Sequence, residues 1–169
     1  MFLTRRRLIA TAACAAALSP LAARPLRAGA TPTGPVILTV TLGEGAAPRP
    51  FDLGMLDALP QRETVTATPW HEGRPSFSGP LISGLLDHVG AAGERLRVVA
   101  LNDYAAEMPV ADVRAFPVIL ATRQDGRPMP VRRKGPIFVI YPFDEHPELA
   151  NEVIYGRSVW QVKGIEVLG

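Results

Sequence analysis

The chain has 169 residues, with 18 basic and 16 acidic side chains and a single cysteine, Cys14. Five arginines and no acidic residue precede residue 31, so residues 31–169 carry 13 basic and 16 acidic side chains, a net charge of −3. This balance excludes a strongly basic surface for nucleic acid, and a segment without cysteine can form neither a disulfide nor a thiolate metal site. Wide spacing also argues against paired metal ligands among the histidines, which are His71, His88 and His146.

The first 30 residues predict an export signal of the twin-arginine type. A Thr-Arg-Arg-Arg sequence at residues 4–7 precedes an apolar run at residues 8–18, and Ala-Gly-Ala at residues 28–30 provides a small-residue cleavage site. The apolar run is shorter than the ~20 residues that span a bilayer, and the general secretory route would also accept this pattern. We therefore expect removal of residues 1–30, Cys14 included, to leave a periplasmic protein that is not embedded in the membrane.

In chain order, the first half of the mature segment predicts two strands and two helices. β-Branched residues predict strands at residues 36–42 and 64–68. Between them, apolar residues at partly helical spacing predict a short helix over residues 51–59. The clearest helix is predicted over residues 80–89, where leucine, isoleucine and valine form one apolar stripe before Gly90.

The second half of the segment is dominated by strand patterns. Alternating or continuous apolar residues predict strands at residues 96–101, 104–108, 118–123, 137–141 and 159–168. An Asp-Gly pair at residues 125–126 predicts a tight turn after the third of them. Because strands dominate and the helices are short, we predict a single α+β domain over residues 31–169, mainly of mixed β structure, long enough to bury its own core.

Six short motifs follow one another along this predicted domain. They are a Leu-Pro segment, a Gly-to-Leu-Leu element, an Asp-Tyr turn followed by Pro, an Asp-Gly hairpin, a Gly-Pro loop with an apolar strand, and a Trp-to-Ile element, at residues 55–60, 77–86, 102–109, 120–128, 134–142 and 160–165. Their order resembles the molybdopterin-binding domain of the sulfite oxidase family over nearly the whole mature segment. The resemblance implies the sulfite oxidase fold.

The chain departs from that family at the metal site. Family enzymes hold molybdenum with a cysteine, whereas the corresponding interval here, residues 66–73, contains none. Without a thiolate to hold or tune a metal, oxidoreductase chemistry is not favoured. No recognisable nucleophile motif predicts a catalytic residue either.

The chain is also similar to exported, cysteine-lacking members of this fold that bind free pterins. That similarity implies a periplasmic receptor with no tightly bound cofactor, which binds a pterin reversibly and acts with an inner-membrane enzyme that makes and degrades cyclic di-GMP. Two alternatives stay open. One is a molybdopterin-dependent oxidoreductase of the sulfite oxidase family, and the other is a structural or interaction protein whose pocket is filled.

A pterin is a flat bicycle with a guanine-like edge, so its pocket needs an aromatic face and polar groups. Trp70 lies where the resemblance places the metal ligand, and it either covers the vacated site or is a core residue that fixes its loop. Asn102 and Asp103 can read the pterin edge, and Tyr104 can stack or donate a hydrogen bond. The same residues can instead form an ordinary hairpin turn.

A cationic segment completes the predicted site. Arg132, Arg133 and Lys134 precede Gly135, in a loop that in family enzymes holds the phosphate side of the cofactor. We predict that Arg133, Lys134 and Gly135 contact an anionic or polyol tail of the ligand, although a run of charges is often only a solvated face. Arg157 is a weaker candidate for the same role, and Trp160 is predicted to be a core residue. An acidic loop at residues 144–148 is either a docking surface or simply solvated.

Overall fold

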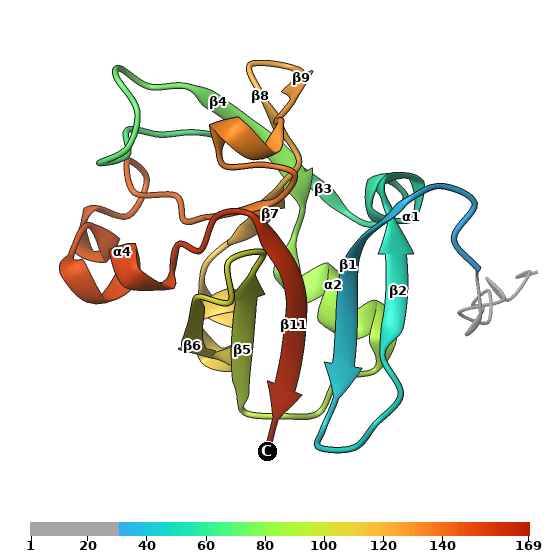
Figure 1. Ribbon diagram of the computed structural model, residues 1–169. Coiled ribbons are helices and arrows are strands. Elements are labelled where there is room, and N and C mark those ends of the chain that lie inside the picture. Colours follow the sequence, from blue (N-terminus) through green and yellow to red (C-terminus); the bar gives the residue numbers. More distant parts are fainter. Residues whose placement is uncertain (1–30) are drawn as a thin grey trace, which may run out of the picture.

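The computed structural model describes residues 31–169 of the chain. The predicted export signal and Cys14 therefore lie outside the described residues. Within the described part, the chain forms three β-sheets and four short α-helices (Figure 1). None of the described helices is long and apolar enough to cross a membrane.

A five-stranded sheet joins the two ends of the described chain. Its strands are β1 (Val36–Leu42), β2 (Arg49–Asp52), β5 (Arg95–Ala100), β6 (Ala105–Pro109) and β11 (Val162–Leu168), in the order β2-β1-β11-β5-β6. The β1–β11 pair is parallel and the other pairs are antiparallel. Side chains alternate across the strands, so one face is buried through residues such as Leu38, Val98 and Ile165.

The remaining strands form two smaller sheets beside the first. One contains β3 (Gln61–Val65), β4 (Ser76–Pro80), β8 (Arg123–Gln124) and β9 (Arg127–Pro128), and the other pairs β7 (Ile119–Ala121) with β10 (Phe138–Ile140). Strands β4 and β7 approach so closely that a Cβ built on Gly79 would lie 2.0 Å from the carbonyl oxygen of Leu120. Only glycine permits this contact between the two sheets.

Four α-helices and two 3₁₀ turns connect the strands. They are α1 (Leu53–Asp57), α2 (Ile82–Val89), α3 (Val110–Ala115), η1 (Val131–Arg133), η2 (Pro147–Leu149) and α4 (Glu152–Arg157). Helix α4 begins at a side-chain cap, because the Asn151 Oδ1 atom accepts hydrogen bonds from the backbone N–H groups of Val153 and Ile154, at 3.1 Å each. Helix α2 ends at Gly90, whose left-handed backbone closes the last turn.

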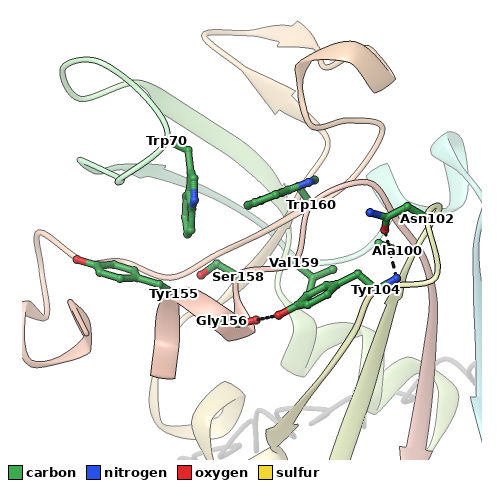
Figure 2. A pocket seen from close by; sticks show the side chains of 9 residues that line it. All are labelled: Trp70, Ala100, Asn102, Tyr104, Tyr155, Gly156, Ser158, Val159 and Trp160. Atoms are coloured by element: carbon green, nitrogen blue, oxygen red, sulfur yellow. Dashed lines mark hydrogen bonds between the residues drawn. The ribbon is translucent and has the colours of Figure 1, made fainter. Parts of the chain in front are cut away.

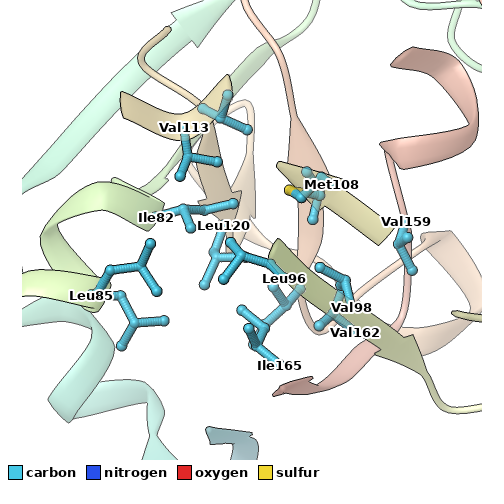
Figure 3. Close-up of a cluster of buried hydrophobic side chains, with 14 of the residues drawn as sticks. Ile82, Leu85, Leu96, Val98, Met108, Val113, Leu120, Val159, Val162 and Ile165 are labelled. Carbon is cyan, nitrogen blue, oxygen red and sulfur yellow. The ribbon is translucent and has the colours of Figure 1, made fainter. Parts of the chain in front are cut away.

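The main hydrophobic core lies between the five-stranded sheet, α2, α3 and the β7–β10 pair. Figure 3 shows part of this cluster, in which Ile82 and Leu85 of α2 face residues of β5, β6 and β11. A second, smaller cluster contains Phe77, Ile119, Ala121, Met129, Phe138 and Ile140. Trp70 packs on the rim of this second cluster, at the edge of the core.

Most predicted elements are present, with shifted ends. The strand predicted at residues 36–42 is β1, and the hairpin predicted from residues 96–101 and 104–108 is the β5–β6 pair. The strand predicted at residues 64–68 ends at Val65, because the next residues leave the sheet for the loop that carries Trp70. Trp160 was wrongly predicted to be a core residue, since it remains 36% exposed.

Candidate functional site

A cavity of about 320 Å³ opens beside the end of the five-stranded sheet (Figure 2). Four segments surround it: the loop between β3 and β4, the β5–β6 turn, helix α4 and the segment that follows α4. The lining residues are Trp70, Ala100, Asn102, Tyr104, Tyr155, Gly156, Ser158, Val159 and Trp160. Both tryptophans of the chain and two of its three tyrosines are among them.

Trp70 contributes one wall of this pocket. Its loop is narrowed by a bridge between Thr68 and His71, whose side chains share a 2.8 Å hydrogen bond between Oγ1 and Nδ1. The indole ring meets the rings of Tyr155 and Trp160 edge to face, with centroids 5.9 Å and 5.6 Å away. Trp70 therefore packs on the second core cluster and also lines the cavity.

Trp160, which was predicted from the sequence to be a core residue, forms another wall of the pocket. A bridge to Phe138 ties its backbone to β10. The Lys134 Nζ atom lies 4.3 Å from the centroid of the Trp160 ring, a cation–π contact. The Lys134 carbonyl oxygen also accepts a 2.9 Å hydrogen bond from the Gln161 N–H, so the cationic loop and the Trp160 segment support each other.

Asn102 and Tyr104 reach the pocket from the β5–β6 turn. The Asn102 Oδ1 atom accepts a 3.2 Å hydrogen bond from the Tyr104 backbone N–H, which shapes the turn. The Tyr104 hydroxyl donates to the Gly156 carbonyl oxygen at 3.1 Å, which links the turn to helix α4 (Figure 2). Two predicted site residues therefore meet Trp70 around one cavity.

Asp103 does not join them. Its backbone is left-handed, with φ +65°, and its side chain is 84% exposed and absent from the cavity lining. The carboxylate instead pairs with the Lys163 Nζ atom at 2.6 Å. That hydrogen bond and charge hold the pKa of Asp103 below its usual value.

Three other residues predicted to contact a ligand tail, Arg133, Gly135 and Arg157, are also absent from the cavity lining. Arg133 lines a separate shallow depression beside Arg127 and Met129. Gly135 is buried, and a Cβ there would lie 1.8 Å from the Met129 carbonyl oxygen, so this glycine is required by packing. Arg157 pairs with Asp112 at 2.6 Å and thereby anchors α4 to α3.

Helix α4 and its neighbours supply the site residues that sequence reasoning missed. Tyr155, Gly156 and Ser158 line the pocket, and the Ser158 hydroxyl donates to the Ile154 carbonyl oxygen at 3.1 Å. Helix α4 has six residues and buries only Ile154, so it carries almost no apolar periodicity. The capping residue Asn151 followed by Glu152 was the one local signal of its start.

The chemistry of the lining is aromatic and neutral. None of the described lining residues carries a charge at neutral pH, and the polar groups are an amide, three hydroxyls, two indole N–H groups and backbone carbonyls. Close by, burial and the positive charge of Lys134 lower the pKa of His71, which favours its neutral imidazole. Among residues 31–169, no group of three or more His, Cys, Asp or Glu side chains gathers as metal ligands. The pocket therefore suits a planar, uncharged ring system.

No protein-family model and no curated protein matches the chain. Solved structures do match it. The sulfane dehydrogenase SoxCD from Paracoccus pantotrophus is similar over 78% of this chain, with a TM-score of 0.58 and 17% sequence identity. The chain spans only 37% of the length of that protein. At this identity the likeness concerns the fold alone, and it supports the predicted α+β domain as a distant sulfite-oxidase-like fold.

Proposed function

We propose that this protein binds a pterin reversibly in the aromatic pocket. One observation carries the proposal: both tryptophans and two of the three tyrosines of the chain border a single cavity. Its volume of about 320 Å³ lies at the lower end of the range of about 300–1,000 Å³ for small-molecule sites. A flat heterocycle of two rings fits this combination of size and aromatic walls.

The polar groups of the pocket complement the 2-amino-4-oxo edge of a pterin. The Asn102 side-chain N–H group can donate to the ring carbonyl, because its Oδ1 atom is already engaged by Tyr104. The Gly156 carbonyl oxygen has a second lone pair that can accept from the ring amino group. In this arrangement a backbone carbonyl takes the role that the sequence suggested for the Asp103 carboxylate.

Tryptophan fluorescence provides the direct test. Because Trp70 and Trp160 are the only tryptophans, emission from residues 31–169 reports on this pocket alone. Titration with a free pterin should quench the emission, and calorimetry should give the same dissociation constant. Tyr155→Ala should weaken binding, whereas Val153→Ala, at an exposed position of the same helix, should not. Unchanged emission and no heat with any pterin would refute the proposal.

The residues present do not fit the molybdenum site of the oxidoreductase alternative. In the interval where family enzymes carry a cysteine, the side chains of Thr68 and His71 bond to each other and no thiolate is present. The open cavity beside Trp70 and Asn102 is likewise the reason to prefer ligand binding over a filled, purely structural pocket. One molybdenum per purified chain together with oxidase turnover would reverse the first preference.

The proposed biological setting is a periplasmic receptor acting with an inner-membrane enzyme that makes and degrades cyclic di-GMP. It rests on the resemblance to cysteine-lacking pterin-binding proteins and on the expected export signal. N-terminal sequencing of the protein from a periplasmic extract should begin near Thr31. Co-purification with such a membrane enzyme, altered by added pterin, should follow. A protein retained in the cytoplasm with an intact N-terminus would contradict this setting.

A further inference from the structure

Asp144 holds together the two segments that carry Trp70 and Tyr155. Its Oδ1 atom accepts hydrogen bonds from the Ala67 N–H at 3.1 Å and from the Thr66 hydroxyl at 3.3 Å. Its Oδ2 atom accepts from the Arg74 Nε–H at 2.5 Å. The Asp144 backbone N–H in turn donates to the Thr66 hydroxyl at 3.1 Å. We name this set of contacts the Asp144 clasp.

The clasp contacts both ends of the loop that carries Trp70 (residues 66–74, the Trp70 loop). Thr66 and Ala67 begin the loop, Arg74 ends it, and the Thr66 N–H closes it with a 3.3 Å bond to the Pro75 carbonyl oxygen. On the other side, Asp144 lies within a turn in which the N–H groups of Glu145 and His146 both donate to the Pro142 carbonyl oxygen. That turn leads through η2 into α4, which carries Tyr155.

Besides the clasp, the edge-to-face contact of Trp70 with Tyr155 also joins these two segments. A second, open hollow of about 570 Å³ lies between them, lined by Ala67, Thr68, Pro69, Arg74, Phe143, Asp144, Pro147, Ala150 and Tyr155. Because this space is a hollow rather than packed core, side chains do not pack across it, and the hydrogen bonds of the clasp join the two segments there. The Asp144 side chain is only 23% exposed, and Thr66 is fully buried.

We propose that Asp144 is a positioning residue for the aromatic pocket. Through the clasp it sets the place of Trp70 relative to Tyr155, whose ring centroids lie 5.9 Å apart, and so sets the shape of the cavity that both rings line. The ligand part of this proposal rests on the proposed pterin binding, whereas the placement of Trp70 does not.

The first experiment therefore needs no ligand. In a Trp160→Phe background Trp70 is the sole tryptophan, and its quenching by acrylamide measures its exposure. Asp144→Ala should raise the quenching constant about twofold or more, because a freed loop exposes the ring. The quenching constant of Asp144→Asn should lie between those of the Trp160→Phe parent and Asp144→Ala. The amide keeps an acceptor for Thr66 and Ala67 but loses the charge that holds Arg74. If Asp144→Ala fails to fold, Arg74→Gln provides the same test from the exposed side of the clasp.

Glu145→Gln is the matched control. Glu145 is the next residue in the same turn and forms an ion pair with Arg62 at 2.6 Å, but Arg62 lies on β3 and not on the Trp70 loop. This variant should leave the quenching of Trp70 unchanged. Equal quenching in Asp144→Ala, Arg74→Gln and Glu145→Gln would overturn the proposal.

The second experiment measures pterin affinity with both tryptophans in place. Asp144→Ala should raise the dissociation constant about tenfold, which corresponds to about 1.4 kcal/mol, while Glu145→Gln stays within about twofold of the wild type. An Asp144→Ala affinity equal to that of Glu145→Gln would overturn the role of the clasp in binding. Absence of binding in the wild type would instead refute the proposed function, and the quenching experiment would then decide the clasp alone.

Discussion

Trp160→Ala is the substitution that best separates a binding wall from a core residue. Trp160 is 36% exposed, so about two-thirds of its side chain is buried against Trp70, Phe138 and Lys134. Truncating a fully buried tryptophan costs about 3–5 kcal/mol of unfolding free energy, and the buried fraction scales this to about 2–3 kcal/mol. For a domain of this length the melting temperature should fall by about 5–10 °C and the protein should remain folded at 25 °C.

The effect on ligand affinity should be separate and large. Stacking of a nucleobase-like ring on an aromatic side chain contributes about 1–3 kcal/mol, which corresponds to about a 5-fold to 150-fold rise in the dissociation constant. Trp160→Phe keeps an aromatic face and should lose less than half of this free energy. Calorimetric titration at 25 °C, run beside thermal melting, measures both quantities. A Trp160→Ala protein that melts earlier but binds a pterin with wild-type affinity would refute the placement of the site.

Three further predictions follow from other residues. Asp103→Ala should leave pterin affinity within about twofold of the wild type, because the Asp103 carboxylate pairs with Lys163 outside the cavity. A tenfold loss of affinity on titration would show that Asp103 contacts the ligand. Gly135→Ala should lower the melting temperature by more than 10 °C, or prevent folding, because its Cβ would overlap the Met129 carbonyl oxygen; a wild-type melting curve would contradict this. The folded state holds the pKa of His71 below its unfolded value of about 6.5, so the unfolded chain binds more protons as the pH falls below about 6.5 and stability should decline there. In urea titrations from pH 7.5 to 5, His71→Gln should reduce that decline, and an unchanged slope would show that other groups cause it.

The sequence predicted three of the residues around the cavity and missed the others for physical reasons. Trp70, Asn102 and Tyr104 belong to motifs whose order along the chain resembles a known fold, and the structure brings them together. Tyr155 and Gly156 lie on a six-residue helix with one buried residue, which leaves no periodic signal. Short helices of this kind are stabilised by caps and tertiary contacts, which cannot be read from local patterns.

Asp103 illustrates a different limit of prediction. A sequence places Asn102, Asp103 and Tyr104 side by side, but backbone dihedral angles decide which side chains face a cavity. The left-handed φ of Asp103 turns its carboxylate toward Lys163, sixty positions further along the chain. Strands β2 and β4 were missed because they are short and contain Pro, Gly or Ser, whereas β1 and β5 were predicted closely from their β-branched residues.

The position of β11 in the sheet affects how the domain folds. The last strand of the described chain lies between β1 and β5, and its parallel pairing joins Thr39 to Gly164 (Figure 1). During synthesis β1 therefore cannot pair with β11 until almost the entire domain has left the ribosome. Such distant pairing slows folding, and it leaves the edges of β1 and β5 open to other chains in the meantime. A ribosome-bound fragment that ends before Val162 should remain sensitive to proteases, whereas a chain in which β11 has left the ribosome should be resistant.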